Sequence, residues 1–426
     1  MKGLRIYQLL PISLFALMCA QFVLAEEVET EATTIPVEEL RLFAEVFDRI
    51  KSAYVEPVSD KKLLEDAIRG MLSGLDPHSA YLDAQAFENL QVHTSGQFGG
   101  LGIEVGLQDG FIRVIAPIDD TPAQRAGIQA GDLITKIGDE SIQGVSLNEA
   151  VDKMRGKIGT PVTLTLMREG IEKPFELTLE RASISVTSVR HRLLETGYGM
   201  IRVSQFQNNT AEQLTRSIDA LRAMGELKGL VLDLRNNPGG VLQAAVQVSD
   251  AFLSEGLIVY TDGRLPNSEL SFSATPETPA GDIPLVVLIN AGSASASEIV
   301  AGALQDHRRA IVMGTDSFGK GSVQTILPVS VDRGVKLTTA RYYTPNGRSI
   351  QADGIRPDVV VEDARITRIE AEANELRERN LSGHLLGEEP AEISHNTDDT
   401  LGQRDYQLYE ALNLLKALNI LRPDQG

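Results

Sequence analysis

The chain lacks tryptophan, has a single cysteine, Cys19, and carries few positive charges for its size. Without a second thiol no intramolecular disulfide can form, so cross-links cannot stabilise the fold. The 40 lysines and arginines are outnumbered by 59 aspartates and glutamates, which gives a formal net charge of −19. Such a chain is expected to avoid nucleic acid and anionic lipid, and its acidity serves solubility. The 426 residues, 42% of them hydrophobic, are enough for several globular domains.

The first 25 residues predict a secretory signal peptide. Lys2 and Arg5 precede the apolar run LLPISLFALMCAQFVLA, which ends at Ala25 before the acidic run EEVETEA. Cleavage after Ala25 would place the mature protein in the periplasm and remove Cys19. An uncleaved membrane anchor is the alternative, because the run has about the length of a short bilayer span. Lipid attachment at Cys19 is disfavoured because the preceding Met18 is bulky.

Residues 26–95 are expected to form an N-terminal helical region. After an acidic linker at 26–36, apolar residues at steps of three and four predict an amphipathic helix, and Ser59-Asp60 begins a second one that ends at Gly74. These faces could pack in a core or form a dimer contact. The stripe of the first helix consists of Leu40, Phe43, Phe47, Ile50 and Tyr54.

Residues 96–180 have the character of a small β-rich domain. Ser146 caps a predicted amphipathic helix, and the run PVTLTLMREG closes the unit as a strand. Other short β-branched stretches alternate with turn residues at 102–105, 111–115 and 133–137.

Residues 181–360 alternate between predicted strands and helices, which indicates α/β layering with a largely parallel sheet. LIVY, residues 257–260, is one of these strands, and the apolar run PLVVLIN is typical of a fully buried one. Residues 361–426 are expected to be a helical region. Its charged helical segments lie at 361–380 and 404–421.

The loop GTDSFGKGSVQ places Lys320 in a setting close to a phosphate-binding motif. Such a motif needs Ser or Thr directly after the lysine to hold magnesium, followed by a helix. Residue 321 is glycine instead, and the β-branched residues after it favour a strand. A phosphate site is therefore disfavoured, and a surface lysine in a turn is the plain alternative to a catalytic one.

In INAGSASASEIVAGALQD a buried strand ends and a helix follows a loop of small residues. Ser295 would lie near the helix N-terminus, where N–H groups and the helix dipole favour developing negative charge. The alternative is that Ser293, Ser295 and Ser297 merely cap the helix.

A nucleophilic serine needs a base. His307 lies about three helical turns beyond Ser295, too far to serve. Lys320 follows the next parallel strand, in a βα-type loop on the same edge of the sheet. It could act if burial, aided by apolar neighbours such as Phe318, lowers the pKa of its amine enough to leave it neutral.

These segments resemble the carboxyl-terminal processing proteases, the tail-specific serine peptidases of the S41 family. The resemblance rests on GSASASEI, FGKGSVQ and LVLDLRNNPGG, and it covers about residues 37–360. It implies an α/β multidomain protein with a ClpP/crotonase-like α/β protease core at 181–360, an inserted β-rich PDZ domain at 96–180, and helical N- and C-terminal segments.

The resemblance also implies roles for single residues. Ser295 would be the nucleophile, Lys320 the general base and Gln324 the residue that orients the lysine, in peptide-bond hydrolysis without metal or cofactor. Asp306 matches a family position that is structural rather than catalytic. The implied oxyanion donors are the N–H groups of Ala296 and of Gly239 or Gly240.

The PDZ-like stretch implies selection of chain ends. The loop FGGLGIEV would bind a terminal carboxylate while the peptide adds as a strand. Arg168 is interpreted as a regulatory residue that links peptide occupancy to assembly of the Ser–Lys pair. A purely structural domain is the alternative. The implied peptide-binding residues are Gly100, Leu101, Gly102, Ile103, Leu147, Val151 and Met154.

The expected protein is thus a periplasmic serine endopeptidase for proteins with accessible C-termini, homo-oligomeric through its terminal helices. A helical-repeat lipoprotein is implied as adaptor, and nucleic acid is not expected as a partner. Two other classes stay open. A catalytically silent PDZ scaffold does not explain why Ser295, Lys320 and Gln324 occur together. A hydrolase or lyase of small thioesters would share the crotonase-type layering but not the PDZ-like module.

Overall fold

The computed structural model describes residues 36–364 apart from 109, 119 and 265–267, together with residues 385 and 399–421. The predicted signal peptide with Cys19, the acidic linker and most of the helical segment predicted at 361–380 lie outside the described residues. The chain divides into two compact units, Met1–Ile68 and Arg69–Gly426. In the described ranges no helix is both long and apolar enough to cross a bilayer.

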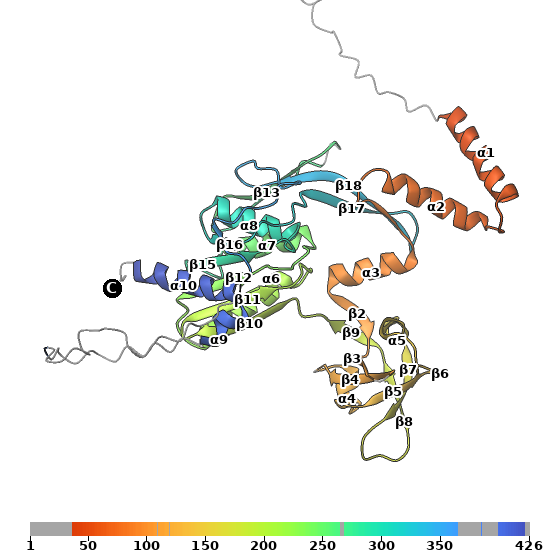
Figure 1. The fold of residues 1–426 in the computed structure, drawn as a ribbon, viewed down its shortest axis with the longest axis horizontal. Helices are drawn as coiled ribbons and strands as arrows, with labels where there is room; N and C mark the ends of the chain where they lie inside the picture. Colours follow the sequence, from red (N-terminus) through yellow and green to blue (C-terminus); the bar gives the residue numbers. More distant parts are fainter. Residues whose placement is uncertain are drawn as a thin grey trace, which may run out of the picture. The chain divides into compact units, whose positions relative to one another are not determined.

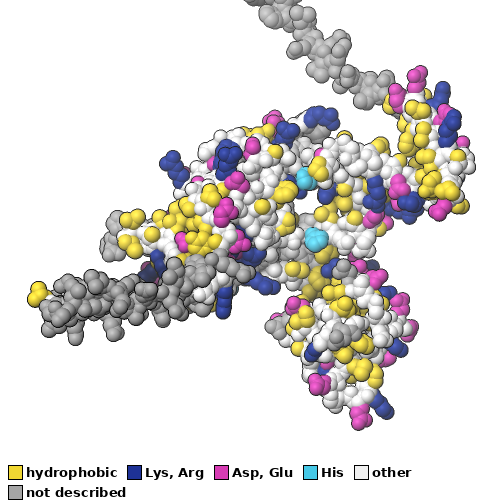
Figure 2. Space-filling view, viewed as in Figure 1, with side chains coloured by type: hydrophobic (Ala, Val, Ile, Leu, Met, Phe, Trp, Pro, Cys, Tyr) yellow, Lys and Arg dark blue, Asp and Glu magenta, His cyan; other side chains and the backbone are white. Residues whose placement is uncertain are grey.

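Two amphipathic helices, α1 (Val37–Ala53) and α2 (Asp60–Ser73), begin the described chain, as predicted (Figure 1). Ser59 Oγ accepts the N–H of Lys62 at 3.3 Å and so caps the start of α2. No residue of α1 is buried, and Figure 2 shows hydrophobic side chains on its surface. The predicted stripe is not packed in a core: Phe47 is half-buried and its other members are exposed, with Leu40 52% exposed.

A short strand β1 (Ala80–Leu82), the helix α3 (Ala84–Ser95) and a strand β2 (Gln97–Gly100) come next. The sequence did not predict α3, because no residue of this helix is buried and its apolar spacing is weak. Its ends define it instead. Asp83 Oδ1 accepts the N–H of Ala86 at 3.0 Å, and Gly96 stops the helix at a φ of 69°.

The predicted β-rich domain is confirmed as an antiparallel sheet in the order β3-β4-β5-β7-β8, with β6 paired to β5. The helix α5 (Leu147–Met154) carries a reciprocal cap, in which Ser146 Oγ accepts the N–H of Glu149 and the Glu149 carboxylate accepts the N–H of Ser146. A second helix, α4 (Pro122–Arg125), is a single turn. The strands are β3 (Ile103–Gln108), β4 (Phe111–Pro117), β5 (Leu133–Ile137), β6 (Glu140–Ser141), β7 (Pro161–Met167) and β8 (Phe175–Glu180).

Beyond this domain, β9 (Ala182–Ser185) pairs antiparallel with β2 in a separate two-stranded sheet. The chain therefore enters and leaves the β-rich domain through two neighbouring strands, which is how a domain can be inserted without opening the core around it.

The core is built on a six-stranded sheet in the order β10-β11-β12-β15-β16-β19, parallel from β11 onward, so the predicted α/β layering is confirmed. α6 (Thr210–Ala223), α7 (Leu242–Asp250) and α8 (Ala296–Asp306) pack on one face, and α10 (Tyr406–Leu421), preceded by α9 (Asp399–Arg404), on the other (Figure 1). The strands are β10 (Val189–Glu195), β11 (Tyr198–Val203), β12 (Gly229–Asp233), β15 (Leu285–Ile289), β16 (Ile311–Gly314) and β19 (Val359–Val360).

The stretch LIVY is a strand, β13 (Leu257–Asp262), but the prediction that it joins the parallel sheet is wrong. It pairs antiparallel with β18 (Gly334–Tyr343) in a second sheet, where Tyr260 stacks on Tyr343 at 5.1 Å between ring centroids. A short apolar run reports burial and not the pairing partner, so the sequence could not assign the sheet. The other members are β1, β14 (Ser271–Ser273) and β17 (Ser322–Pro328).

Candidate active site

Ser295 and Lys320 lie in loops that follow neighbouring parallel strands. β15 and β16 pair in parallel, Ser295 follows β15, and Lys320 follows β16. Both residues line one pocket of about 420 Å³. The prediction of a βα-type loop at Lys320 is wrong, because this loop leads into β17 of the second sheet. The helix that a phosphate-binding loop requires is therefore replaced by a strand.

Ser295 stands at the turn into α8 with a φ of 56° and a ψ of −112°, a conformation that residues with a side chain seldom adopt. It is 6% exposed. A strained strand–turn–helix junction is also how other hydrolases present a nucleophilic serine. Burial raises the pKa of the neighbouring Tyr342, and a hydrogen bond with Ser295 opposes that rise. The serine therefore faces a phenol that stays protonated at neutral pH.

The two flanking serines anchor the loop that follows β12. Ser293 Oγ donates to the carbonyl of Leu234 at 2.8 Å, and Ser297 Oγ donates to the carbonyl of Asn237 at 2.9 Å. Both hydroxyl groups are buried. The three serines thus have different partners, which the capping interpretation did not anticipate.

Glu298 connects the serine loop to the lysine loop, and the sequence analysis missed it. Its Oε2 accepts the N–H of Ser295 at 2.6 Å and the N–H of Lys320 at 2.9 Å. Its Oε1 accepts from Ser317 Oγ and from the N–H of Gly319, both at 2.6 Å. The side chain is 1% exposed. The serine followed three residues later by glutamate, a capping-box pattern, was the available signal.

Lys320 is half-buried in the pocket. Burial lowers the pKa of its amine, and the charge of Lys336 lowers it further, while Glu298 and Asp76 act in the opposite sense without cancelling the effect. Phe318 was expected to help desolvate the lysine, but it is 61% exposed and does not line the pocket. Val323 and Ile326 of β17 line it instead.

Gln324 lines the same pocket, on β17. Its amide nitrogen donates to Ser322 Oγ at 3.0 Å and to Thr338 Oγ1 at 3.4 Å. No hydrogen bond joins it to Lys320 within the described ranges. Its role in orienting the lysine stays a prediction.

The glycines of NNPGG lie directly beside the serine. A Cβ on Gly239 would come within 2.8 Å of Ser295 Cβ and 2.9 Å of the Ala296 nitrogen, so only glycine fits there. The Gly239 N–H already donates to Asn237 Oδ1 at 2.9 Å. In the part of the chain that the structure describes, the N–H groups of Gly240 and Ala296 have no acceptor. These two remain free to bind an oxyanion.

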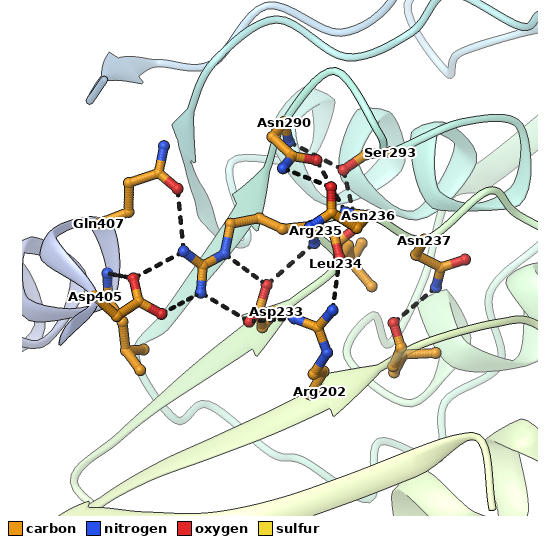
Figure 3. A network of polar contacts seen from close by, with 12 residues as sticks. Arg202, Asp233, Leu234, Arg235, Asn236, Asn237, Asn290, Ser293, Asp405 and Gln407 are labelled. Carbon is orange, nitrogen blue, oxygen red and sulfur yellow. Dashed lines mark hydrogen bonds and ion pairs between the residues drawn. The ribbon is translucent and has the colours of Figure 1, made fainter. Parts of the chain in front are cut away.

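The base of the same loop is tied to the C-terminal helices through Arg235 (Figure 3). The guanidinium makes a bidentate pair with Asp405, at 2.8 and 2.7 Å, and also binds Asp233 and the Oε1 of Gln407. Asp233 in turn accepts from Arg202 at 3.0 Å. The residues preceding α10 thus fix the start of the loop that carries Gly239.

We expect Asp405→Asn to lower the free energy of unfolding by about 2–4 kcal/mol, because it breaks a mostly buried bidentate pair. Burial opposes ionisation of Asp405, but the hydrogen bonds and charge of Arg235 outweigh it and lower the carboxyl pKa. A lowered pKa stabilises the fold above the unfolded value and loses this effect as the pH falls. Denaturant unfolding should therefore show the full difference above about pH 5 and a shrinking one below about pH 4. An unchanged difference at pH 3 would contradict the ion-pair explanation.

The side chains of the five predicted peptide-binding residues that are not glycine fall into two groups. Leu101 and Met154 are buried in the core of the β-rich domain, whereas Ile103, Leu147 and Val151 lie half-buried at its edge. Within the described ranges the N–H groups of Leu101 and Gly102 have no acceptor. β3 is an edge strand of its sheet. Gly100 and Gly102 are buried, and a Cβ on Gly102 would come within 2.2 Å of Thr121 Cβ.

Arg168 interacts within the β-rich domain. Its guanidinium binds both carboxylate oxygens of Asp132 at 2.7 Å, donates to the carbonyl of Gly127, and lies over the ring of Phe175. None of these contacts of Arg168 involves Ser295 or Lys320.

The remaining candidates have structural partners. His307 binds the carbonyl of Leu257, and Asp306 pairs with Arg348 and accepts the N–H of Asn346. Among the described residues, no group of three or more His, Cys, Asp or Glu side chains is placed to hold a metal ion.

Three family models match the chain. The model for peptidase family S41 matches residues 197–361, a PDZ domain model matches residues 99–179, and the model for the N-terminal domain of the activating protease CtpB matches residues 17–86. The PDZ domain and the S41 core inferred from the sequence are thereby confirmed.

The chain is also similar to whole proteins of this kind. The carboxy-terminal-processing protease of Bartonella bacilliformis is 46% identical over 406 residues, 94% of this chain and 93% of that protein. A carboxyl-terminal-processing protease of Synechocystis is 40% identical, over 75% of this chain and 76% of that one. Among solved structures, the photosystem II D1 C-terminal processing protease is 31% identical, over 77% of this chain and 94% of that chain, with a TM-score of 0.44. Since the Bartonella protein matches almost from end to end, this chain belongs to peptidase family S41 and is a serine peptidase of the carboxy-terminal processing type.

Proposed function

We propose that the protein is an exported endopeptidase in which Ser295 is the nucleophile and Lys320 the general base. The observation that carries this proposal is that the two residues line one pocket, with the pKa of the lysine lowered mainly by burial. A neutral amine at neutral pH can accept a proton, whereas an ordinary lysine cannot. The strained backbone at Ser295 supports the same assignment.

The reaction follows from the positions of these groups. Ser295 Oγ attacks the scissile carbonyl carbon while Lys320 Nζ takes its proton, and the N–H groups of Ala296 and Gly240 bind the oxyanion. The ammonium then returns the proton to the leaving amine, which departs as the new N-terminus. Water, deprotonated by the same amine, then attacks the acyl carbon, and the ammonium returns this proton to Ser295 Oγ as the ester bond breaks and the new C-terminus leaves. In this scheme Gln324 holds the amine in line, and Gly239 lets the loop after β12 lie against the turn that carries Ser295.

We propose that the PDZ domain selects substrates by their C-termini. The free N–H groups of Leu101 and Gly102 would bind the terminal carboxylate, and the peptide would pair with the open edge of β3 beside Leu147 and Val151. Arg168, held against Asp132, would report this occupancy to the active site.

The exposed stripe of α1 would form the homo-oligomer contact. Residues 1–25 would direct export to the periplasm, where a helical-repeat lipoprotein would act as adaptor.

One assay tests the proposal. We expect the purified protein to cleave an unfolded protein with a free C-terminus faster than the same protein amidated at its C-terminus, because the amide cannot accept hydrogen bonds as a carboxylate does. Lys320→Ala should lower the cleavage of both substrates by roughly a thousandfold or more. Arg168→Ala should lose only the part of the rate that the free tail adds.

Each outcome decides one point. Full activity of Lys320→Ala would exclude the lysine as base, and equal cleavage of the two substrates would exclude capture of the carboxylate. If the wild-type protein cleaved neither substrate, the result would favour the catalytically silent PDZ scaffold. If it hydrolysed only small thioesters, the result would favour the crotonase-type enzyme.

A further inference from the structure

A second lysine, Lys336, lines the same pocket as Ser295 and Lys320. It lies on β18, opposite Ile326 of β17 on one side and Ala80 of β1 on the other, so both neighbouring strands fix its backbone. The side chain is half-buried. Its amine has neither an ion-pair nor a hydrogen-bond partner within the described ranges. Holding a cation half-buried without a partner costs free energy.

The carboxylates that face Lys320 are engaged elsewhere. Glu298, on α8, accepts four hydrogen bonds from the two catalytic loops. Asp76, in the loop before β1, accepts from the N–H of His78 at 2.7 Å, from the N–H and Oγ of Ser79, and from Thr338 Oγ1. Neither carboxylate makes an ion pair with a lysine amine in the described part of the chain.

The other titratable groups around the pocket leave Lys336 as the main source of positive charge. Burial lowers the pKa of His78, so the neutral form of this ring dominates at neutral pH. Tyr342 on β18 stays protonated. His93 on α3 also lines the pocket. Burial and the charge of Lys336 together outweigh Glu298 and Asp76 and lower the pKa of Lys320.

We propose that Lys336 is a positioning residue whose positive charge keeps Lys320 neutral and ready to accept the serine proton. Two ammonium groups in one half-buried pocket repel each other, and burial adds to this repulsion at Lys320, so Lys320 is the lysine that loses its proton. Entry of substrate would displace water and strengthen the repulsion. The catalytic importance of Lys336 rests on the proposed function of Lys320 as the base. The effect of the Lys336 charge on the Lys320 amine can be measured without that assumption.

The test measures the Lys320 amine directly. In the Ser295→Ala protein, reductive methylation of Lys320 is followed by mass spectrometry across pH, because only a neutral amine reacts. We expect Lys336→Gln to move the midpoint of this reaction up by about one pH unit, the order of one charge–charge interaction in such a pocket. Lys336→Arg, which keeps the charge, should leave the midpoint in place. An unmoved midpoint in the glutamine variant, or the same shift in both variants, overturns the proposal.

Proteolysis separates this inference from the proposed function. With Ser295 intact and an amidated substrate without acidic residues, Lys336→Gln should move the acid limb of kcat/KM up by the same amount as the labelling midpoint. The rate at pH 7 should fall about tenfold and recover at high pH. A loss that is equal at every pH would mean that Lys336 binds substrate or supports the fold, which contradicts the proposal. A shift in labelling without a shift in the acid limb would instead contradict the role of Lys320 as base.

Discussion

Replacement of Ser295 by alanine should lower kcat by roughly 10⁴- to 10⁶-fold, as loss of the nucleophile does in other serine peptidases. The remaining rate would come from substrate binding and from oxyanion stabilisation by the N–H groups of Ala296 and Gly240. Stability should fall by at most about 1–2 kcal/mol, because the alanine methyl group fits the site and the hydrogen bond with Tyr342 is lost. The measurements are single-turnover cleavage of an unfolded protein and thermal unfolding of the same sample.

Ser293 and Ser297 provide matched controls in the same sequence run. Ser297→Ala removes a buried donor to the carbonyl of Asn237 and should cost about 1–3 kcal/mol of stability. Its effect on kcat should be far smaller than that of Ser295→Ala, because only the position of the NNPGG loop changes. If Ser297→Ala abolished cleavage as completely as Ser295→Ala while the protein stayed folded, the assignment of Ser295 as the nucleophile would be contradicted.

The contrast among these serines shows which features of the active site could be predicted from the sequence. Contiguous motifs identified the two loops that form the pocket, because each loop lies directly after a strongly apolar strand. The residues flanking Ser295 looked equivalent in the sequence. Only the approach of the loop after β12, distant in the chain, gives Ser293 and Ser297 their partners.

The predictions that failed also depended on long-range contacts. Residues 257–260 read as a parallel strand because their apolar run fits one, but pairing with β18 places them in the second sheet. Phe318 looked like a desolvating neighbour of Lys320, yet a residue two positions away in a loop can point into solvent, as this one does. The helix α3 was missed because caps rather than an apolar face define it.

Glu298 is the second residue whose replacement should have a large effect. Glu298→Gln keeps the volume of the side chain but turns one of its two oxygen atoms into an NH₂ group. Each oxygen accepts two hydrogen bonds, so the new donor must face two existing donors whichever way the amide lies. We expect a loss of about 2–4 kcal/mol in the free energy of unfolding, because buried donors are left unsatisfied.

Activity should fall as well, by about a hundredfold, because a shift of either loop by about 1 Å separates the nucleophile from its base. Glu212→Gln on the exposed face of α6 is the matched control, with the same chemical change and a partner only in a surface ion pair with Arg216. It should alter neither stability nor rate. The decisive measurement is kcat at a temperature where both variants are fully folded. If Glu298→Gln kept the wild-type kcat there, the carboxylate would stabilise the fold without aligning Ser295 and Lys320.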